Sequence, residues 1–231
     1  MLEFNPLQKI PSFPTISPKK RLILNKYIVE FIGTFFLVLT VGCTVVGNGA
    51  GAFAPLAIGS ALMVMIFAGG HISGGHFNPA VTLGVWLRRR CETKDVAPYM
   101  GFQIFGAVLA AFAVKFLKGG AAVTPLQPAT GPALLAEFLF TFALVYVVLN
   151  TATAKGTSGN SFYGLAIGFT VLVGAFSVGN ISGGAFNPAV AVGISVMGLS
   201  SWPNIWIYLV ADFVGGAVAA LAFKALNPAD N

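Results

Sequence analysis

A ten-residue stretch occurs twice in this chain of 231 residues, at 72–81 and again at 181–190. Both copies read Ile-Ser-Gly-Gly-x-Phe-Asn-Pro-Ala-Val, where x is histidine in the first copy and alanine in the second. Proline fits the first turn of a helix because its missing N–H needs no partner there, and asparagine is favoured at the preceding N-cap. Each copy therefore predicts a helix that begins at Pro79 or at Pro188, directly after a glycine-rich segment.

The apolar stretches that follow these prolines, residues 79–87 and 188–199, are too short to cross a membrane. At about 1.5 Å per residue they span roughly 14–18 Å, about half of a hydrocarbon core roughly 30 Å thick. A membrane is nevertheless indicated, because 56% of the residues are hydrophobic and only 9% are charged. Irregular backbone at membrane depth is tolerated only inside protein or along a water-filled path. The sequence thus predicts two half-helices beside a cavity or pore.

Long uncharged runs predict six membrane-spanning helices, near residues 27–47, 55–71, 98–117, 132–153, 161–179 and 203–224. The repeat extends over these runs, since Glu30-Phe31 and Glu137-Phe138 begin matching segments. Each unit contains three spans and one half-helix. Because three is an odd number, the second unit enters the membrane upside down relative to the first, as in transporters built from inverted repeats.

We therefore expect an all-α membrane protein with six transmembrane helices and two re-entrant half-helices, related by an inverted repeat. Its channel domain is expected at residues 27–225, with one repeat at 27–117 and the other at 134–225. A tail at 1–26 would precede it and an end at 226–231 would follow it.

The positive charges predict the orientation. Of the 13 lysine and arginine residues, only Lys115 and Lys118 fall on the side of the membrane opposite to the chain ends. By the positive-inside rule both termini are cytoplasmic, in a multi-pass integral membrane protein whose residues 1–25 lack the pattern of a cleavable signal. The net charge of +6 then reflects topology. No basic and aromatic patch lies outside these loops, so we expect no nucleic-acid partner. Arg88–Arg90 are expected to face lipid headgroups and the end of the half-helix.

The twin Asn-Pro-Ala boxes, the twin Glu-Phe-x-x-Thr-Phe starts and the run from His71 to His76 resemble the aquaporin, or major intrinsic protein, family. The resemblance covers about residues 27–225. It implies a barrel in the lipid bilayer, usually a homotetramer with one pore per subunit, that passively conducts water and small uncharged solutes. It also implies that Asn78 and Asn187 donate N–H groups to water in single file. Independently, two half-helix N-termini at one point repel cations and reverse the polarity of a water chain, which opposes proton relay.

The resemblance assigns the pore-lining residues. The boxes are Asn78, Pro79, Ala80, Asn187, Pro188 and Ala189, and the four filter positions are Ile58, Ala175, Gly184 and Val190. The family usually has an arginine where this chain has Val190, so the resemblance implies an apolar and wider constriction. Hydrogen peroxide, ammonia and urea are then expected beside water. Ala191 stands where the glycerol branch usually has aspartate, which argues against a standard glycerol facilitator, although a wide apolar filter would still pass glycerol.

Acidic residues inside predicted spans are costly and usually functional or paired. Glu30 and Glu137 stand at matching positions, which favours acceptance of hydrogen bonds from the backbone before each box over a proton relay. Asp212 corresponds to Gln103 by the offset of the repeat. We expect it to hydrogen-bond within the bundle or across a tetramer contact, with a pore-facing or ion-binding role as the alternative.

The two histidines, His71 and His76, are expected to support the first pore loop, with a pH gate as the alternative. They lack a third ligand for a metal, so we expect no metal and no cofactor. A coupled transporter would need ion-coordinating residues at the midplane, and an enzyme would need a nucleophile or an acid–base pair facing the cavity. Neither assembles in this sequence, and we expect no enzyme. A neutral-solute facilitator with little preference for water, or a structural or junctional membrane protein without significant flux, remain alternatives.

Overall fold

The structure, a computed structural model, describes residues 18–230. The first 17 residues of the predicted tail and residue 231 lie outside the described part of the chain. Six long helices are present, namely α1 (Pro18–Val45), α2 (Ala54–Ser73), α4 (Thr93–Leu117), α5 (Thr130–Val148), α6 (Tyr163–Ser182) and α8 (Ile205–Leu226). All six are long and apolar enough to cross a membrane. The predicted all-α fold with six spans is therefore confirmed.

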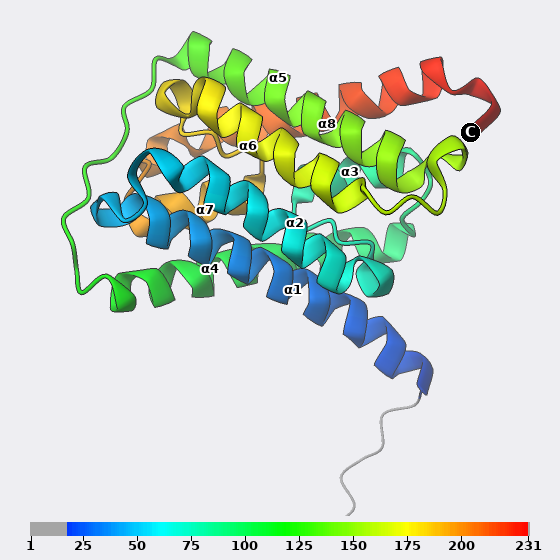
Figure 1. The fold of residues 1–231 in the computed structure, drawn as a ribbon, viewed down its shortest axis with the longest axis horizontal. Helices are drawn as coiled ribbons and strands as arrows, with labels where there is room; N and C mark the ends of the chain where they lie inside the picture. The colour runs from blue at the N-terminus through cyan, green and yellow to red at the C-terminus, as the bar shows by residue number, and fades with distance from the viewer. Residues whose placement is uncertain (1–17, 231) are drawn as a thin grey trace, which may run out of the picture.

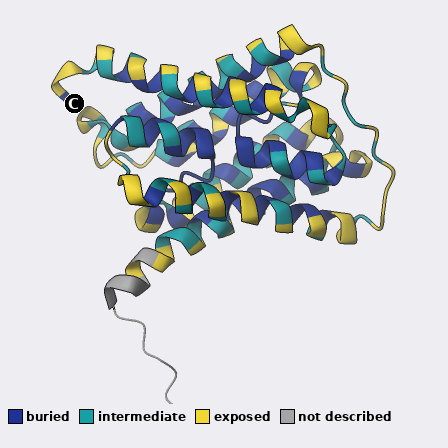
Figure 2. Ribbon diagram, turned by 180° about the vertical axis from the view of Figure 1, so that it is seen from behind, coloured by how far each residue is buried: buried dark blue, intermediate teal, exposed yellow. Residues whose placement is uncertain are grey.

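Two short helices, α3 (Pro79–Leu87) and α7 (Pro188–Met197), begin at the predicted prolines. They enter the bundle from opposite ends, and their N-termini approach each other near its centre (Figure 1). Most of their residues are buried, so the two helices form the middle of the core (Figure 2). The long helices surround them in pairs that follow the repeat: α1 packs on α4, α5 packs on α8, and α2 packs on α6.

Helix boundaries differ from the sequence prediction mainly at N-terminal ends. Helix α1 begins at Pro18 and α4 at Thr93, both earlier than expected. Hydropathy marks only the part of a helix that lies in the hydrocarbon core, whereas residues such as lysine and arginine continue a helix beyond it. Helix α5 ends in a π-helical turn at Leu149–Thr153. The two described ends of the chain lie at the same end of the bundle (Figure 1).

Glycines turn the chain from α2 and α6 into the segments that precede the short helices, residues 74–78 and 183–187, which are the first and second pore loops. Helix α2 ends at Gly74 with φ of 93°, and α6 ends at Gly183 with φ of 99°. This left-handed conformation is readily adopted only by glycine and is a common way to end a helix. The chain then runs without helical structure to Asn78 and Asn187, where the short helices begin.

The end of α3 differs from the sequence prediction. Arg88 is buried, with 3% of its surface exposed, so the expectation that it faces lipid headgroups is wrong. Its guanidinium lies 3.0 Å from the carboxylate of Asp230 and 4.6 Å from the ring centre of Phe223. Asp230 belongs to a short helical turn after α8, Pro228–Asp230, and supplies the opposite charge that makes burial of the arginine tolerable.

Candidate pore

The two box asparagines cap the short helices and tie the pore loops together. The Oδ1 atom of Asn78 accepts from Ala80 N at 2.8 Å, and that of Asn187 accepts from Ala189 N at 2.9 Å. Their amide nitrogens reach across the molecule: Asn78 Nδ2 donates to the carbonyl of Phe186 at 2.8 Å, and Asn187 Nδ2 donates to that of Phe77 at 2.9 Å. An amide nitrogen carries two N–H groups, so one remains on each asparagine. Both residues line the same cavity.

The residue before each asparagine has an unusual backbone conformation. Phe77 and Phe186 have φ values of 49° and 48°, and both side chains are 99% buried. Bulky residues rarely adopt this left-handed conformation, so the surrounding contacts must hold it. The main-chain N–H of Phe77 donates to Glu30 Oε2 at 2.6 Å, and that of Phe186 donates to Glu137 Oε2 at 2.6 Å.

Glu30 and Glu137 each gather donors from the pore loop beside them. Glu30 Oε1 accepts from Ser73 Oγ at 2.7 Å and from His76 N at 3.0 Å. Glu137 Oε1 accepts from Ser182 Oγ at 2.6 Å and from Ala185 N at 3.0 Å. Both glutamates are completely buried. A carboxylate that accepts several such bonds fixes the loop in a single conformation, because each bond to a charged acceptor is strong.

Two tyrosines that the sequence analysis did not single out complete these loops. The hydroxyl of Tyr99 donates to the carbonyl of Ser73 at 2.7 Å, and the hydroxyl of Tyr208 donates to the carbonyl of Ser182 at 2.6 Å. These carbonyls end α2 and α6, where the helix itself supplies no donor. The two tyrosines stand at the repeat offset, so aligning the two halves residue by residue would have found them.

A narrow cavity of about 70 Å³ runs past both asparagines. All four predicted filter residues, Ile58, Ala175, Gly184 and Val190, contribute to its wall. Among the described residues that line it, only His76, Asn78 and Asn187 have polar side chains. A volume of this size holds a few water molecules. The wall therefore offers few side-chain hydrogen bonds and no charged side chain to whatever enters.

The narrow cavity borders a wider vestibule of about 780 Å³. Gly75, His76, Val148 and Ile167 line both spaces, so the vestibule meets the narrow cavity at these residues. His71, Arg90 and Lys155 also line the vestibule, which gives it a more polar wall.

The two predicted histidines have different surroundings. His76 is 92% buried, and its Nδ1 lies 3.1 Å from Thr82 Oγ1 on α3. The ring of Tyr99 lies 5.1 Å away, measured between ring centres. His71 is exposed and makes no hydrogen bond to any described residue, so only His76 is built into the first pore loop.

The comparisons with known proteins agree with this geometry. The family model described as "Major intrinsic protein" matches residues 13–223. Aquaporin NIP1-1 from rice (Oryza sativa subsp. japonica) is 38% identical over 217 residues, which is 88% of this chain and 75% of the relative. Glycerol uptake facilitator protein-like 6 from Lactiplantibacillus plantarum is 36% identical over 217 residues, 90% of this chain and 100% of the relative.

The fold is also that of a solved structure. The aquaglyceroporin from Plasmodium falciparum superposes with a TM-score of 0.75 at 23% sequence identity, covering 90% of this chain and 98% of the other. This likeness shows the fold, and the family model together with the relatives in plants and bacteria shows the family: the chain belongs to the major intrinsic protein family, the family of the aquaporins.

Proposed function

We propose that the protein is a passive channel for water and small uncharged solutes, among them hydrogen peroxide, ammonia, urea and glycerol. The observation that carries this proposal is the narrow cavity in which Asn78 and Asn187 each keep one free amide N–H against an otherwise apolar wall. Members of the family are channels rather than enzymes, and we extend this to the present chain.

The arrangement of α3 and α7 supports exclusion of ions and protons. Each helix N-terminus carries a partial positive charge, and the two N-termini approach each other at the asparagines. Cations are repelled at that point, and an anion would lose most of its hydration against an apolar wall that offers it only a few hydrogen-bond donors. Water that accepts from both asparagines turns its hydrogens away from the centre in both directions. A hydrogen-bonded chain reversed in this way does not relay protons.

The filter positions support a broad range of neutral solutes. Val190 is buried in the wall of the cavity, and Ala175 and Gly184 add little bulk. None of the described residues that line the passage carries a fixed positive charge, so we propose that the width of the passage is set by the packing of α2, α6 and α7. The similarity to a relative named as a glycerol uptake facilitator supports including glycerol among the solutes.

We propose that both termini are cytoplasmic. The described ends of the chain share one end of the bundle (Figure 1). Lys155 lies 3.8 Å from Asp230 at the C-terminal end of the described chain, and it lines the vestibule together with Arg90. Positive charge concentrated at one face is typical of the cytoplasmic side.

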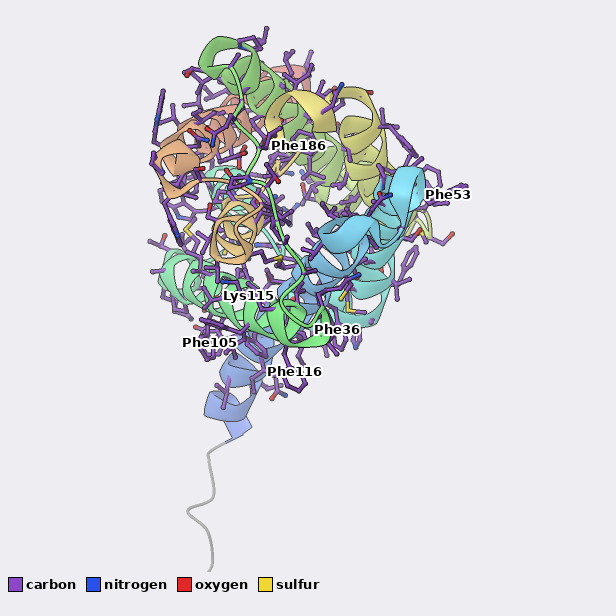
Figure 3. All side chains as sticks on the ribbon, turned by 90° about the vertical axis from the view of Figure 1, so that its left-hand side faces the viewer. Phe36, Phe53, Phe105, Lys115, Phe116 and Phe186 are labelled. Carbon is purple, nitrogen blue, oxygen red and sulfur yellow. The ribbon has the colours of Figure 1, made fainter. Side chains whose placement is uncertain are left out.

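We further propose a homotetramer. An exposed apolar face on α1 and α4, which includes Phe36, Phe105 and Phe116, is available to lipid or to another copy (Figure 3). Native mass spectrometry of the full chain in mild detergent would test the number of subunits, since a monomer alone would contradict a tetramer.

The experiment that tests the proposed function measures solute entry into liposomes by stopped-flow light scattering. Wild-type protein should admit hydrogen peroxide, urea and glycerol faster than bare lipid does. Val190→Arg should reduce entry of the larger solutes, because it adds bulk and a charge to the wall of the cavity. Val190→Met is the matched control, which adds bulk without charge. Bare-lipid rates for every solute and for water would contradict a channel and favour the structural or junctional alternative.

A further inference from the structure

The two halves of the molecule differ at one buried position beside the pore loops. Gln103 on α4 and Asp212 on α8 stand at corresponding positions of the repeat, and both are completely buried. Gln103 contacts Glu30, and Asp212 contacts Glu137 through its side chain. In the second half, a carboxyl group therefore stands next to another carboxyl group where the first half has an amide.

In the first half, each of the two carboxylate oxygens of Glu30 accepts two hydrogen bonds. Oε1 accepts from Ser73 Oγ and His76 N. Oε2 accepts from Phe77 N at 2.6 Å and from Gln103 Nε2 at 2.8 Å. The amide of Gln103 thus supplies the last donor that this glutamate can take from its neighbours.

In the second half, the corresponding set of donors is one short. Glu137 Oε1 accepts from Ser182 Oγ and Ala185 N, whereas Oε2 accepts only from Phe186 N among the described residues. On its neighbour, Asp212 Oδ1 accepts from Thr141 Oγ1 at 2.9 Å. The buried Oδ2 of Asp212 has no hydrogen-bond partner within residues 18–230. A vacant acceptor position and an oxygen without a donor thus occur in the same contacting pair.

Among the described side chains near this pair, no cation is placed to neutralise a second negative charge. The helices packed against α8 are α5, α3 and α7, and the helical turns Leu149–Thr153, Trp202–Asn204 and Pro228–Asp230 also contact it. The only titratable group of these turns is Asp230, which follows the C-terminal end of α8 and pairs with Arg88. Helices α3 and α7 contain no ionisable side chain, and the titratable groups of α5 are Glu137 and Tyr146. On α8 itself they are Tyr208, which donates to the carbonyl of Ser182, and Lys224, about 18 Å from Asp212 along the helix axis.

The main-chain N–H of Asn187 also interacts with the Asp212 carboxyl group, but this interaction offsets only part of the cost of burying a negative charge there. Two adjacent buried carboxylates without a cation are not both ionised, since repulsion and lost hydration act together.

We infer that Asp212 is a positioning residue that works as a neutral carboxylic acid, its Oδ2–H donating to Glu137 Oε2 in the place of the Gln103 amide. The bound proton completes the hydrogen bonds of Glu137, which in turn holds Phe186 in its left-handed conformation beside Asn187. The geometry of the second pore loop thus depends on a proton, whereas that of the first depends on an amide. This role is independent of which solutes pass through the channel.

Infrared spectroscopy of the purified full chain in liposomes tests the inference directly. A protonated carboxylic acid has a C=O stretching band well separated from those of amides and carboxylates. At neutral pH the wild type should show this band, and ¹³C labelling of the aspartate carboxyl groups should shift it. Asp212→Asn should remove it. Absence of the band, its indifference to aspartate labelling, or its survival in Asp212→Asn would each overturn the inference.

Two further variants separate the proton from mere packing. Gln103→Glu introduces the same kind of acid pair in the first half, and should add a band that shifts with ¹³C-glutamate and not with ¹³C-aspartate. Asp212→Asn keeps an N–H donor for Glu137 and should retain the wild-type melting temperature. Asp212→Leu removes the donor and should melt at a lower temperature than Asp212→Asn. Equal melting temperatures of Asp212→Asn and Asp212→Leu would contradict the positioning role. If Asp212→Leu does not fold, the infrared comparison of the wild type with Asp212→Asn still shows whether Asp212 is protonated.

Discussion

Gly59 of α2 and Gly168 of α6 face each other across the contact between these helices. A methyl group added to Gly59 would lie 2.6 Å from the carbonyl oxygen of Gly168, and one added to Gly168 would lie 2.5 Å from that of Gly59. The two backbones are therefore in direct contact, as small residues permit in membrane proteins. Ile58 and Ala175, which line the narrow cavity, lie on the same two helices.

Gly168→Ala should destabilise the protein by about 1–3 kcal/mol, because the added methyl group forces the helices apart. Thermal unfolding in detergent measures the effect. Gly179→Ala is the matched control on the same helix, since a methyl group at that position meets no atom within 4 Å. The control should leave the melting temperature unchanged or raise it slightly. Equal melting of the two variants would mean that the crossing of α2 and α6 tolerates the extra volume.

Glu30→Gln should lower the free energy of unfolding by about 2–3 kcal/mol or more, because the new NH₂ group faces main-chain N–H donors that need an acceptor. His76 N and Phe77 N, which now donate to different oxygens of Glu30, would then compete for the single side-chain oxygen of the glutamine. Chemical or thermal unfolding in detergent measures the loss. Glu92→Gln is the control, since Glu92 is exposed and, among the described residues, forms its ion pair with the exposed Lys94. A wild-type melting temperature for Glu30→Gln would show that the carboxylate is not needed to hold the loop.

The contact of Asp230 with Lys155 and Arg88 predicts an acid-sensitive end of the bundle. The main-chain N–H of Lys155, at 2.8 Å, and the Arg88 guanidinium hold the pKa of Asp230 below its ordinary value. A lowered folded-state pKa adds stability that is complete above the ordinary value of about 3.9 and is lost as the pH falls through the lowered one. Wild-type protein should therefore lose thermal stability below about pH 4, and Asp230→Asn should lose less of it over that interval. Parallel pH profiles would refute this assignment.

The thiol of Cys91, in the loop after α3, should react slowly. Burial raises its pKa to about 11, and the nearby Asp95 carboxylate acts in the same direction. Since only the thiolate is a strong nucleophile, labelling by maleimide should be slow at neutral pH and should accelerate as the pH rises toward 11. Cys91→Ser isolates the contribution of Cys43. Fast labelling of Cys91 at neutral pH would contradict the buried environment.

The repeat in the sequence carries most of what can be predicted here. It gives the number of spans, the inverted orientation and the starts of both short helices at Pro79 and Pro188, because proline after an N-cap residue is a local signal. The long uncharged runs around these prolines predict a membrane protein, and two helices too short to cross the membrane predict a cavity or pore beside them. These features depend on residues close together in the chain.

Other features of the site depend on contacts between distant segments and have no local signal. Nothing near Phe77 in the sequence indicates a left-handed backbone, because the contact with Glu30 that supports it is 47 residues away. The amide of Asn78 crosses to a carbonyl 108 residues away. In the sequence Arg88 is grouped with Arg89 and Arg90, which are exposed, whereas Arg88 itself is buried and paired with Asp230. These hydrogen-bond and ion-pair partners meet only when distant segments pack together, so the residue pattern of one segment does not predict them.

The measurement that tests the central claim most directly is osmotic water flow into proteoliposomes, recorded together with proton leakage by an internal pH-sensitive dye. The account predicts water flow much faster than through bare lipid and only weakly dependent on temperature, with no increase in proton leakage. Water flow at the bare-lipid rate would contradict a pore through the cavity beside Asn78 and Asn187. Rapid proton leakage alongside rapid water flow would contradict the role of the two opposed half-helices.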